Sequence, residues 1–280
     1  MTRSPERPDP VPDGIWGPQG RDRTLFSRFE NKYVVRPDLV GAMRQYLRPF
    51  VRPDEFAARL PGFTYPIGSL YLDSNDLALC KATVDGIKNR YKLRIRSYTD
   101  DPLLPVYCEI KRRMNGVILK RRGRIDREHI PGLLAGRLPD SESLYPGTRP
   151  ALEEFRMLAL TTGAKPVMRV RYEREAYVSR AGDPVRVTFD TMLRGSFTTS
   201  CELSLDAGRW TDIRVGGVIL EIKFTDHFPT WIGDLVRMFQ LQKRSVAKYV
   251  MCILHGRPGG LGRAVQQAGL PRAMEVHKQP

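Results

Sequence analysis

The feature that most constrains the fold is an alternation of charged and apolar residues that recurs in many short segments. Successive side chains of a β-strand point to opposite faces, so a period of two predicts strands with one charged and one apolar face. In YKLRIRSY, Lys92, Arg94 and Arg96 share one face and oppose an apolar one. The alternation recurs over residues 28–36, 69–73, 88–98, 106–113, 117–126, 167–178, 185–190, 201–206 and 218–224. These segments provide enough strands to close an antiparallel barrel.

Carboxylates accompany the cations on three of these segments. The Glu-x-Lys pairs are Glu30 with Lys32, Glu109 with Lys111, and Glu221 with Lys223. A wet face of an ordinary antiparallel sheet would also be polar, but such faces usually mix short polar side chains with both signs of charge. The repeated concentration of long cations therefore predicts a charged interior. Together with the helical patterns given below, the strands predict an α+β fold. We expect an antiparallel β-barrel that encloses a charged tunnel, with helices packed on its apolar outer wall.

Helical patterns interrupt the strands. They span residues 37–47, 151–160 and 230–241, and another begins near Ser245. The two ends of the chain differ from the part between them. Residues 1–24 are rich in Pro, Asp, Arg and Gly, which predicts a disordered N-terminal segment, and residues 256–280 predict a flexible basic tail. We expect one tunnel domain over residues 25–255.

Charge indicates the kind of partner. The 280 residues carry 46 Lys and Arg against 31 Asp and Glu, a formal net charge of +15, which favours a polyanion without saying which one. A tunnel crowded with cations is electrostatically unfavourable when empty. A polyanionic guest, with a few Glu side chains holding a divalent cation, would relieve that repulsion. Sequence-specific nucleic-acid binding is not expected, because no recognition helix or exposed aromatic platform is evident.

Other composition features bear on location. The four cysteines are widely spaced and form no CxxC motif, so the sequence predicts neither a zinc site nor a disulfide framework and favours a reducing cytoplasm. The four histidines show no metal-ligand spacing. No apolar run approaches the roughly 18 residues that cross a bilayer. We therefore expect a soluble, cytoplasmic protein.

An ordered series of motifs carries a family resemblance. The motifs are RFENKYVV, SLYLDS, YKLRIRSY, CEIKRR, VILKRR, RYEREAY, VRVTFD, LEIKF and SVAKYV, running from about Thr24 to about Leu254. In this order they resemble the VTC domain, the polyphosphate polymerase branch of the triphosphate tunnel metalloenzymes. The wider superfamily often begins with Glu-x-Glu-x-Lys, whereas this chain has Arg28 at the first position. That difference favours the VTC branch and leaves the number of metal ligands open.

The resemblance implies site residues. Side chains expected to grip phosphates are Lys32, Arg94, Arg96, Lys111, Lys120, Arg174, Arg186 and Lys248, with Lys223 as a further catalytic cation. The expected ligands of Mn²⁺ or Mg²⁺ are Glu221 first, then Glu109 and Glu30. Positioning and charge neutralisation are the main catalytic needs of phosphoryl transfer, and these residue types provide both.

The implied reaction transfers the γ-phosphoryl group of ATP to a growing polyphosphate chain. Two alternatives remain: hydrolysis of inorganic triphosphate or a nucleoside triphosphate in the same tunnel, and polyphosphate binding without turnover. We expect this chain to have neither the SPX domain nor the membrane segments of the eukaryotic relatives. Any association with a membrane is therefore expected to come from a partner protein.

Three placements stay open at this level. Arg174 shares the strand face of Met168, Val170 and Tyr172, because they alternate along the strand. Either a bulge turns its side chain toward the tunnel, or Arg171 is the tunnel residue. Asp190 could balance Arg186 instead of binding metal. Trp231 could stack on a nucleotide base, although an aromatic residue at helical spacing more often packs in a core.

Overall fold

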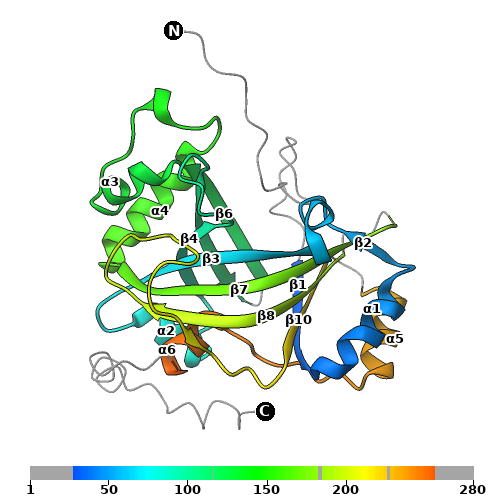
Figure 1. Ribbon diagram of the computed structural model, residues 1–280. Coiled ribbons are helices and arrows are strands. Elements are labelled where there is room, and N and C mark those ends of the chain that lie inside the picture. The colour runs from blue at the N-terminus through cyan, green and yellow to red at the C-terminus, as the bar shows by residue number, and fades with distance from the viewer. Residues whose placement is uncertain (1–27, 116, 182–184, 226–227, 256–280) are drawn as a thin grey trace.

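The computed structural model describes residues 29–115, 117–181, 185–225 and 228–255, and the backbone of Arg28. The expectations for residues 1–24 and 256–280 fall outside this part. The described chain mixes helices with one antiparallel sheet (Figure 1). This confirms the α+β class.

Ten strands form the sheet. The long ones are β1 (Arg28–Val35), β3 (Thr64–Asp73), β4 (Arg90–Ser97), β5 (Val106–Met114), β6 (Val117–Ile125), β7 (Lys165–Ser179), β8 (Arg186–Phe197) and β10 (Val218–Thr225). Two short ones, β2 (Val51–Pro53) and β9 (Thr211–Asp212), pair with β7 and β8. The long strands follow the order β1-β10-β8-β7-β3-β4-β5-β6, and every neighbouring pair is antiparallel.

The sheet curves around an interior without closing by backbone hydrogen bonds. Its order begins at β1 and ends at β6, and no ladder joins these two strands within the described residues. A side-chain contact spans the gap instead: the ammonium of Lys111 on β5 lies 2.9 Å from the carboxylate of Glu30 on β1. The expected barrel is therefore barrel-like in shape but open in its ladder.

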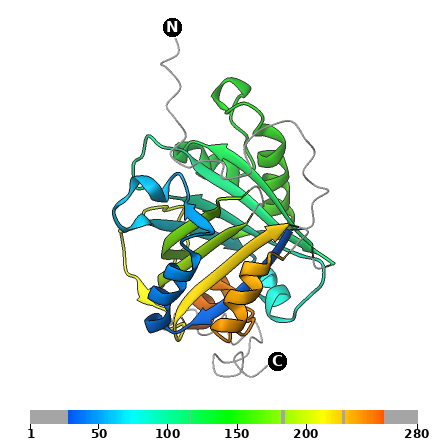
Figure 2. The same cartoon turned by 90° about the vertical axis from the view of Figure 1, so that its right-hand side faces the viewer.

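Helices cover much of the outer, apolar face. Their bounds are α1 (Val40–Leu47), α2 (Ala78–Val84), α3 (Ile130–Leu134), α4 (Arg149–Thr162), α5 (Thr230–Met238) and α6 (Lys248–His255). Figure 2 shows α1 and α5 against the β1–β10 end of the sheet, where Met43 and Leu235 pack with Leu220. At the other end, Leu152 and Phe155 of α4 pack in one cluster with Ile95 of β4. The predicted arrangement of an apolar outer wall beneath helices is confirmed.

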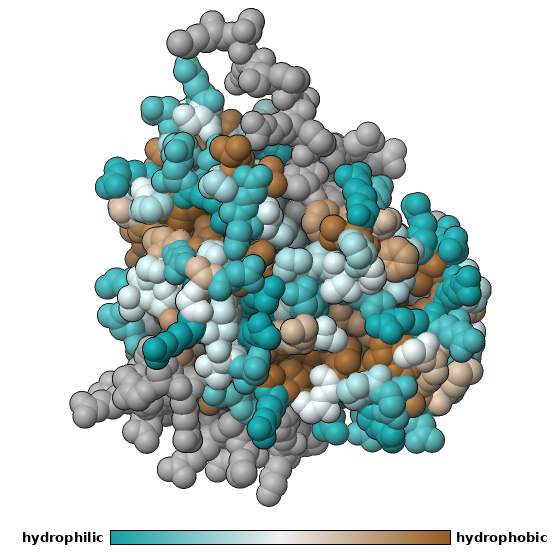
Figure 3. All heavy atoms as spheres, viewed as in Figure 1, coloured by the Kyte–Doolittle hydropathy of each residue, from teal (hydrophilic) through white to brown (hydrophobic). Residues whose placement is uncertain are grey.

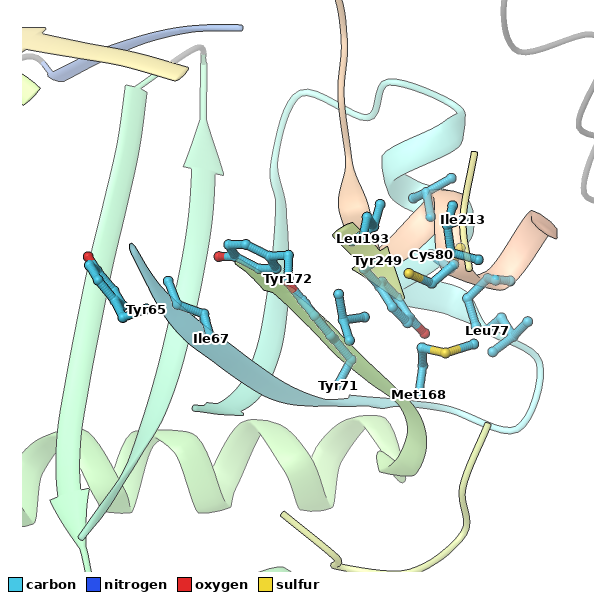
Figure 4. Packing of buried hydrophobic residues seen from close by; sticks show 14 of the residues in the cluster. Tyr65, Ile67, Tyr71, Leu77, Cys80, Met168, Tyr172, Leu193, Ile213 and Tyr249 are labelled. Atoms are coloured by element: carbon cyan, nitrogen blue, oxygen red, sulfur yellow. The ribbon is translucent and has the colours of Figure 1, made fainter. Parts of the chain in front are cut away.

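The last helix packs differently, against the inner face of β7 and β8. Gly195 makes room for it, because a Cβ atom at this position would lie 3.0 Å from the Cβ of Cys252. Tyr249 of α6 stacks on Tyr71 of β3, with ring centroids 4.6 Å apart (Figure 4). Met168 belongs to the same cluster. One part of the interior is therefore an apolar core, and the charged part lies beside it.

Residues 201–206 are not a strand, contrary to the sequence prediction. They form a loop on the outside of β3 and β7, where the backbone N–H of Leu205 donates to Asp100 at 2.6 Å. Leu205 fills the space above Gly68, since a Cβ there would lie 2.3 Å from its Cδ2 atom. The alternation in this segment reflects one side chain buried against the sheet, with no neighbouring strand to complete a ladder.

The exterior is mixed in polarity. Figure 3 shows hydrophilic and intermediate residues over most of the described surface on one face, with smaller hydrophobic areas between them. Trp231 stacks on Phe50 with centroids 5.2 Å apart and packs against the cluster of Met43, Leu220 and Leu235, so the packing role is confirmed. None of the helices in the described ranges combines the length and the apolar character that a membrane crossing requires.

Candidate functional site

A cavity rich in cations lies inside the curved sheet. It is bounded by β1, β3, β4, β5, β7 and β10, and by the beginning of α6. Its lining consists of Lys32, Tyr71, Lys92, Arg94, Arg96, Lys111, Tyr172, Arg174, Glu221, Lys223, Ala247, Lys248 and Tyr249. The structure thus brings together most of the site residues named from the sequence. Lys120, Arg186, Glu30 and Glu109 lie outside this lining and contact other groups, described below.

Glu109 of β5 is fully buried within a ring of cations. Its carboxylate oxygens lie 2.6 Å from Lys120, 2.7 Å from Arg94, 3.5 Å from Arg122 and 3.9 Å from Arg96. The strand register explains the ring, since Glu109 stands opposite Arg94 on β4 and Arg122 on β6. Burial raises the pKa of this carboxyl, but the cations outweigh burial and hold its pKa well below the ordinary value. Glu109 stays ionised and orients the cations around it.

A second network joins β1, β10 and β5. The ammonium of Lys32 lies 3.0 Å from Glu30 and 3.9 Å from Glu221. Glu221 pairs with Lys223 at 2.7 Å, and Glu30 pairs with Lys111 at 2.9 Å. Burial raises the pKa of both carboxyls, but the surrounding lysines lower each pKa below its ordinary value. Both carboxylates therefore remain negatively charged at neutral pH.

Arg174 faces the interior from the same side of β7 as Met168, Val170 and Tyr172. The ladder between β3 and β7 is regular from Tyr65 opposite Arg174 to Tyr71 opposite Met168. The extra residue lies in β8, near Met192, which has a φ of 51°. The inner face of β7 is therefore apolar at one end and carries Arg174 further along. The bulge that β7 does contain lies at Val167, away from Arg174, so it does not turn Arg174 inward, and Arg171 does not take its place.

The partners of Arg174 fix its direction. Its guanidinium donates two hydrogen bonds to Asp190, at 2.6 and 2.7 Å. Asp190 also lies 2.6 Å from the ammonium of Lys248 at the start of α6. Arg171 points to the outer face, where it lies 3.3 Å from Asp206. The buried carboxylate thus holds two cations from different elements beside the cavity.

Asp190 does not balance Arg186, as the sequence had allowed. Arg186 donates instead to Asp54, at 2.6 Å, and to the hydroxyl of Tyr65, at 3.1 Å. Asp190 stands opposite Arg174 in the register between β7 and β8, which explains its pairing. The partner of Arg186 comes from the segment after β2, which strand parity could not identify.

Lys92 and Lys111, which line the cavity, are held there at an electrostatic cost. Burial, together with neighbouring Lys111 and Lys32, lowers the pKa of Lys92 to about 7. Burial also lowers the pKa of Lys111 to about 8, although Glu30 opposes the shift. Lys92 has no ion pair or hydrogen bond from its side chain to any other described residue. An anion in the cavity would stabilise the protonated form of both lysines.

The carboxylates are not grouped as a complete metal cage. No cluster of three or more His, Cys, Asp or Glu side chains in the described ranges could hold a metal ion. Mg²⁺ and Mn²⁺, however, bind hard oxygens and commonly need only one or two carboxylates when phosphate oxygens complete the coordination. Glu221, an ionised carboxylate in the cavity lining, fits that requirement. Glu109 lies outside this lining, within its own ring of cations.

Several lining residues were not named as site residues from the sequence. Lys92 belongs to the same cationic face as Arg94 and Arg96, so strand parity contained the signal. Tyr71 and Tyr172 gave no such signal, because in the sequence they resemble ordinary core aromatics. Their hydroxyl groups gain a polar environment only when β3, β4 and β7 come together.

Comparison with known proteins assigns the chain to a family. The sequence profile of the VTC domain matches residues 27–255. No curated protein matches the chain.

The solved structures that match this one include two proteins described as "putative" adenylate cyclases. One, from Bacillus halodurans, is 13% identical with a TM-score of 0.46, and the alignment covers 79% of this chain and 94% of that one. The other, from Hippeastrum and described as having a dominant triphosphatase activity, is 16% identical with a TM-score of 0.44, covering 85% and 99%. A Pyrococcus horikoshii protein is 14% identical with a TM-score of 0.42, covering 82% and 99%. The match to the family profile over nearly all of the described chain is the decisive finding, and the chain belongs to the VTC domain family.

Proposed function

We propose that this protein is a metal-dependent polyphosphate polymerase that transfers the γ-phosphoryl group of ATP to the end of a phosphate chain. The observation that carries the proposal is the excess of cations in the cavity, including Lys92, which has no carboxylate partner among the described residues. A polyanion is the ligand that such an interior favours. Membership of the VTC domain family supports a phosphate chain as that polyanion.

The cations around the cavity would divide the work of holding phosphate. Arg94, Arg96 and Arg174 present forked donors that match phosphate oxygens, and each is already oriented by a neighbouring side chain. Lys32, Lys111 and Lys248 provide compact charges. Because these groups are fixed before substrate arrives, they can neutralise charge on the transferred group without rearranging. Lys120 and Arg186, beside the cavity, would contact phosphates further along the chain.

Glu221 would hold the divalent metal together with phosphate oxygens. Bound Mn²⁺ or Mg²⁺ supplies charge neutralisation at the triphosphate. Glu30, held by Lys32 and Lys111, would support the same region. In the reaction, a terminal oxygen of the acceptor chain forms a new bond to the γ-phosphorus. The bond from that phosphorus to the β,γ-bridging oxygen breaks, and ADP leaves.

Product analysis tests the proposal. Purified protein incubated with ATP and Mn²⁺ should form phosphate chains that lengthen with time, whereas Glu221→Gln should form none. Glu153→Gln, at a half-exposed position on α4, is the matched control and should behave as the wild type. Release of orthophosphate without longer chains would instead establish a tunnel triphosphatase. Binding of polyphosphate without turnover under any metal would establish a binding module.

A further inference from the structure

Two tyrosine hydroxyl groups lie among the cations of the cavity. Tyr71 of β3 and Tyr172 of β7 are only 7% and 3% exposed, and both line the cavity. Arg94 donates a hydrogen bond to the Tyr71 oxygen at 3.2 Å, and Arg96 donates to the Tyr172 oxygen at 3.3 Å. Both rings can be followed in Figure 4. Each hydroxyl oxygen thus already accepts a hydrogen bond from an arginine.

The O–H groups of Tyr71 and Tyr172 also need hydrogen-bond acceptors. A buried tyrosine O–H normally donates a hydrogen bond as well. Neither hydroxyl donates to any acceptor in the described part of the chain. Besides Arg96, the cations beside the Tyr172 ring are donors only: the Lys248 ammonium lies 4.7 Å from its ring centroid and the Arg174 guanidinium 5.3 Å from it. Two buried donors therefore face a cavity whose nearby cations cannot accept their protons.

We propose that the hydroxyl groups of Tyr71 and Tyr172 donate hydrogen bonds to non-bridging oxygens of a phosphate chain in the cavity. This inference rests on the proposed function and adds two uncharged ligands to the cations already named. Phosphate oxygens are strong acceptors, and each can receive a hydrogen bond from a tyrosine while an arginine contacts a neighbouring oxygen. The same phosphate would then contact both members of a Tyr–Arg pair, Tyr71 with Arg94 or Tyr172 with Arg96.

The surroundings of each tyrosine fit this role. Tyr249 stacks on Tyr71 and is itself anchored by a hydrogen bond that it donates to Asp73 at 2.8 Å, so the Tyr71 ring cannot turn away freely. For Tyr172, burial alone would raise the pKa, but Arg174 and Arg96 outweigh burial and lower the pKa of this phenol. A more acidic phenol is a stronger hydrogen-bond donor. A phosphate chain would counteract the positive field and keep the phenol protonated.

Calorimetric titration of tripolyphosphate, without metal, tests the inference. The variants are Tyr71→Phe and Tyr172→Phe, which keep the rings and remove only the hydroxyl groups. Each should bind about tenfold more weakly than the wild type, the factor expected when one hydrogen bond to a charged acceptor is lost. The matched control is Tyr46→Phe on the outer face, where the hydroxyl donates to the carbonyl of Trp231 at 2.9 Å. Its affinity should equal that of the wild type.

Ionisation of the phenol provides a readout that packing alone would not change. Tripolyphosphate should move one tyrosine ionisation of the wild type to higher pH, as followed by phenolate absorbance, and Tyr172→Phe should lack that component. If the wild type binds tripolyphosphate and both Phe variants bind it within about twofold of the same affinity, the inference is overturned and the proposed function stands. If the wild type does not bind tripolyphosphate, both are overturned.

Discussion

Replacing Glu109 with Gln removes one negative charge from the centre of four cations while keeping the size of the side chain. The ion pairs lost include contacts of 2.6 Å with Lys120 and 2.7 Å with Arg94. Because the carboxylate is fully buried, the remaining cations repel one another where water cannot screen them well. Removing one partner of a buried ion pair typically costs about 3–5 kcal/mol. We expect Glu109→Gln to lower the free energy of unfolding by about that amount.

Urea denaturation at pH 7, without phosphate, measures this loss. Tripolyphosphate should recover much of it, because the anion supplies the missing negative charge, and saturation at about 100 times the dissociation constant adds about 2.7 kcal/mol. The variant should therefore be stabilised by tripolyphosphate more than the wild type is. Glu153→Gln, which removes a half-exposed ion pair with Arg149, should change stability by less than about 1 kcal/mol. A Glu109→Gln stability within about 1 kcal/mol of the wild type would refute the reasoning.

Three further outcomes are expected. Lys92→Met should raise the free energy of unfolding of the phosphate-free protein by about 2–4 kcal/mol, as measured by thermal unfolding. It should also weaken tripolyphosphate binding, as measured by calorimetry. An unchanged affinity would contradict a contact between Lys92 and the anion in the cavity. The pKa of Lys92 is about 7 in the folded protein and 10.5 in its reference state, so between these pH values the unfolded chain binds more protons than the folded protein. The free energy of unfolding without phosphate should therefore rise with pH above 7. A free energy of unfolding from urea denaturation that does not change with pH would contradict this. Bound phosphate should raise the pKa of Lys92 and Lys111, so binding of tripolyphosphate should take up protons and its affinity should fall as pH rises above 7. Calorimetry in buffers of different ionisation enthalpy measures this proton uptake, and proton release on binding would contradict it.

Strand parity predicted the charged interior because it depends only on the period of the sequence. Lys92, Arg94 and Arg96 on one strand, and Glu221 and Lys223 on another, needed no knowledge of neighbouring strands. The outer apolar wall followed from the same alternation. These parts of the fold could therefore be predicted from local sequence.

Contacts between strands depend on register, which local sequence does not contain. Asp190 pairs with Arg174 because the two residues stand opposite each other in the β7–β8 ladder. The extra residue of β8 near Met192 shifts the register of that ladder for the residues that follow Asp190. Arg186 finds Asp54, which is 132 residues away along the chain. Residues 201–206 show the opposite error, since alternation was present there without a partner strand.

The central claim is that a phosphate chain lies in the cavity between Arg94, Arg174 and Lys248. A crystal structure of the protein with tripolyphosphate tests this claim most directly. The account predicts phosphate oxygens within hydrogen-bonding distance of these three cations. Tripolyphosphate bound only on the outer surface, with the interior ion pairs unchanged, would contradict it.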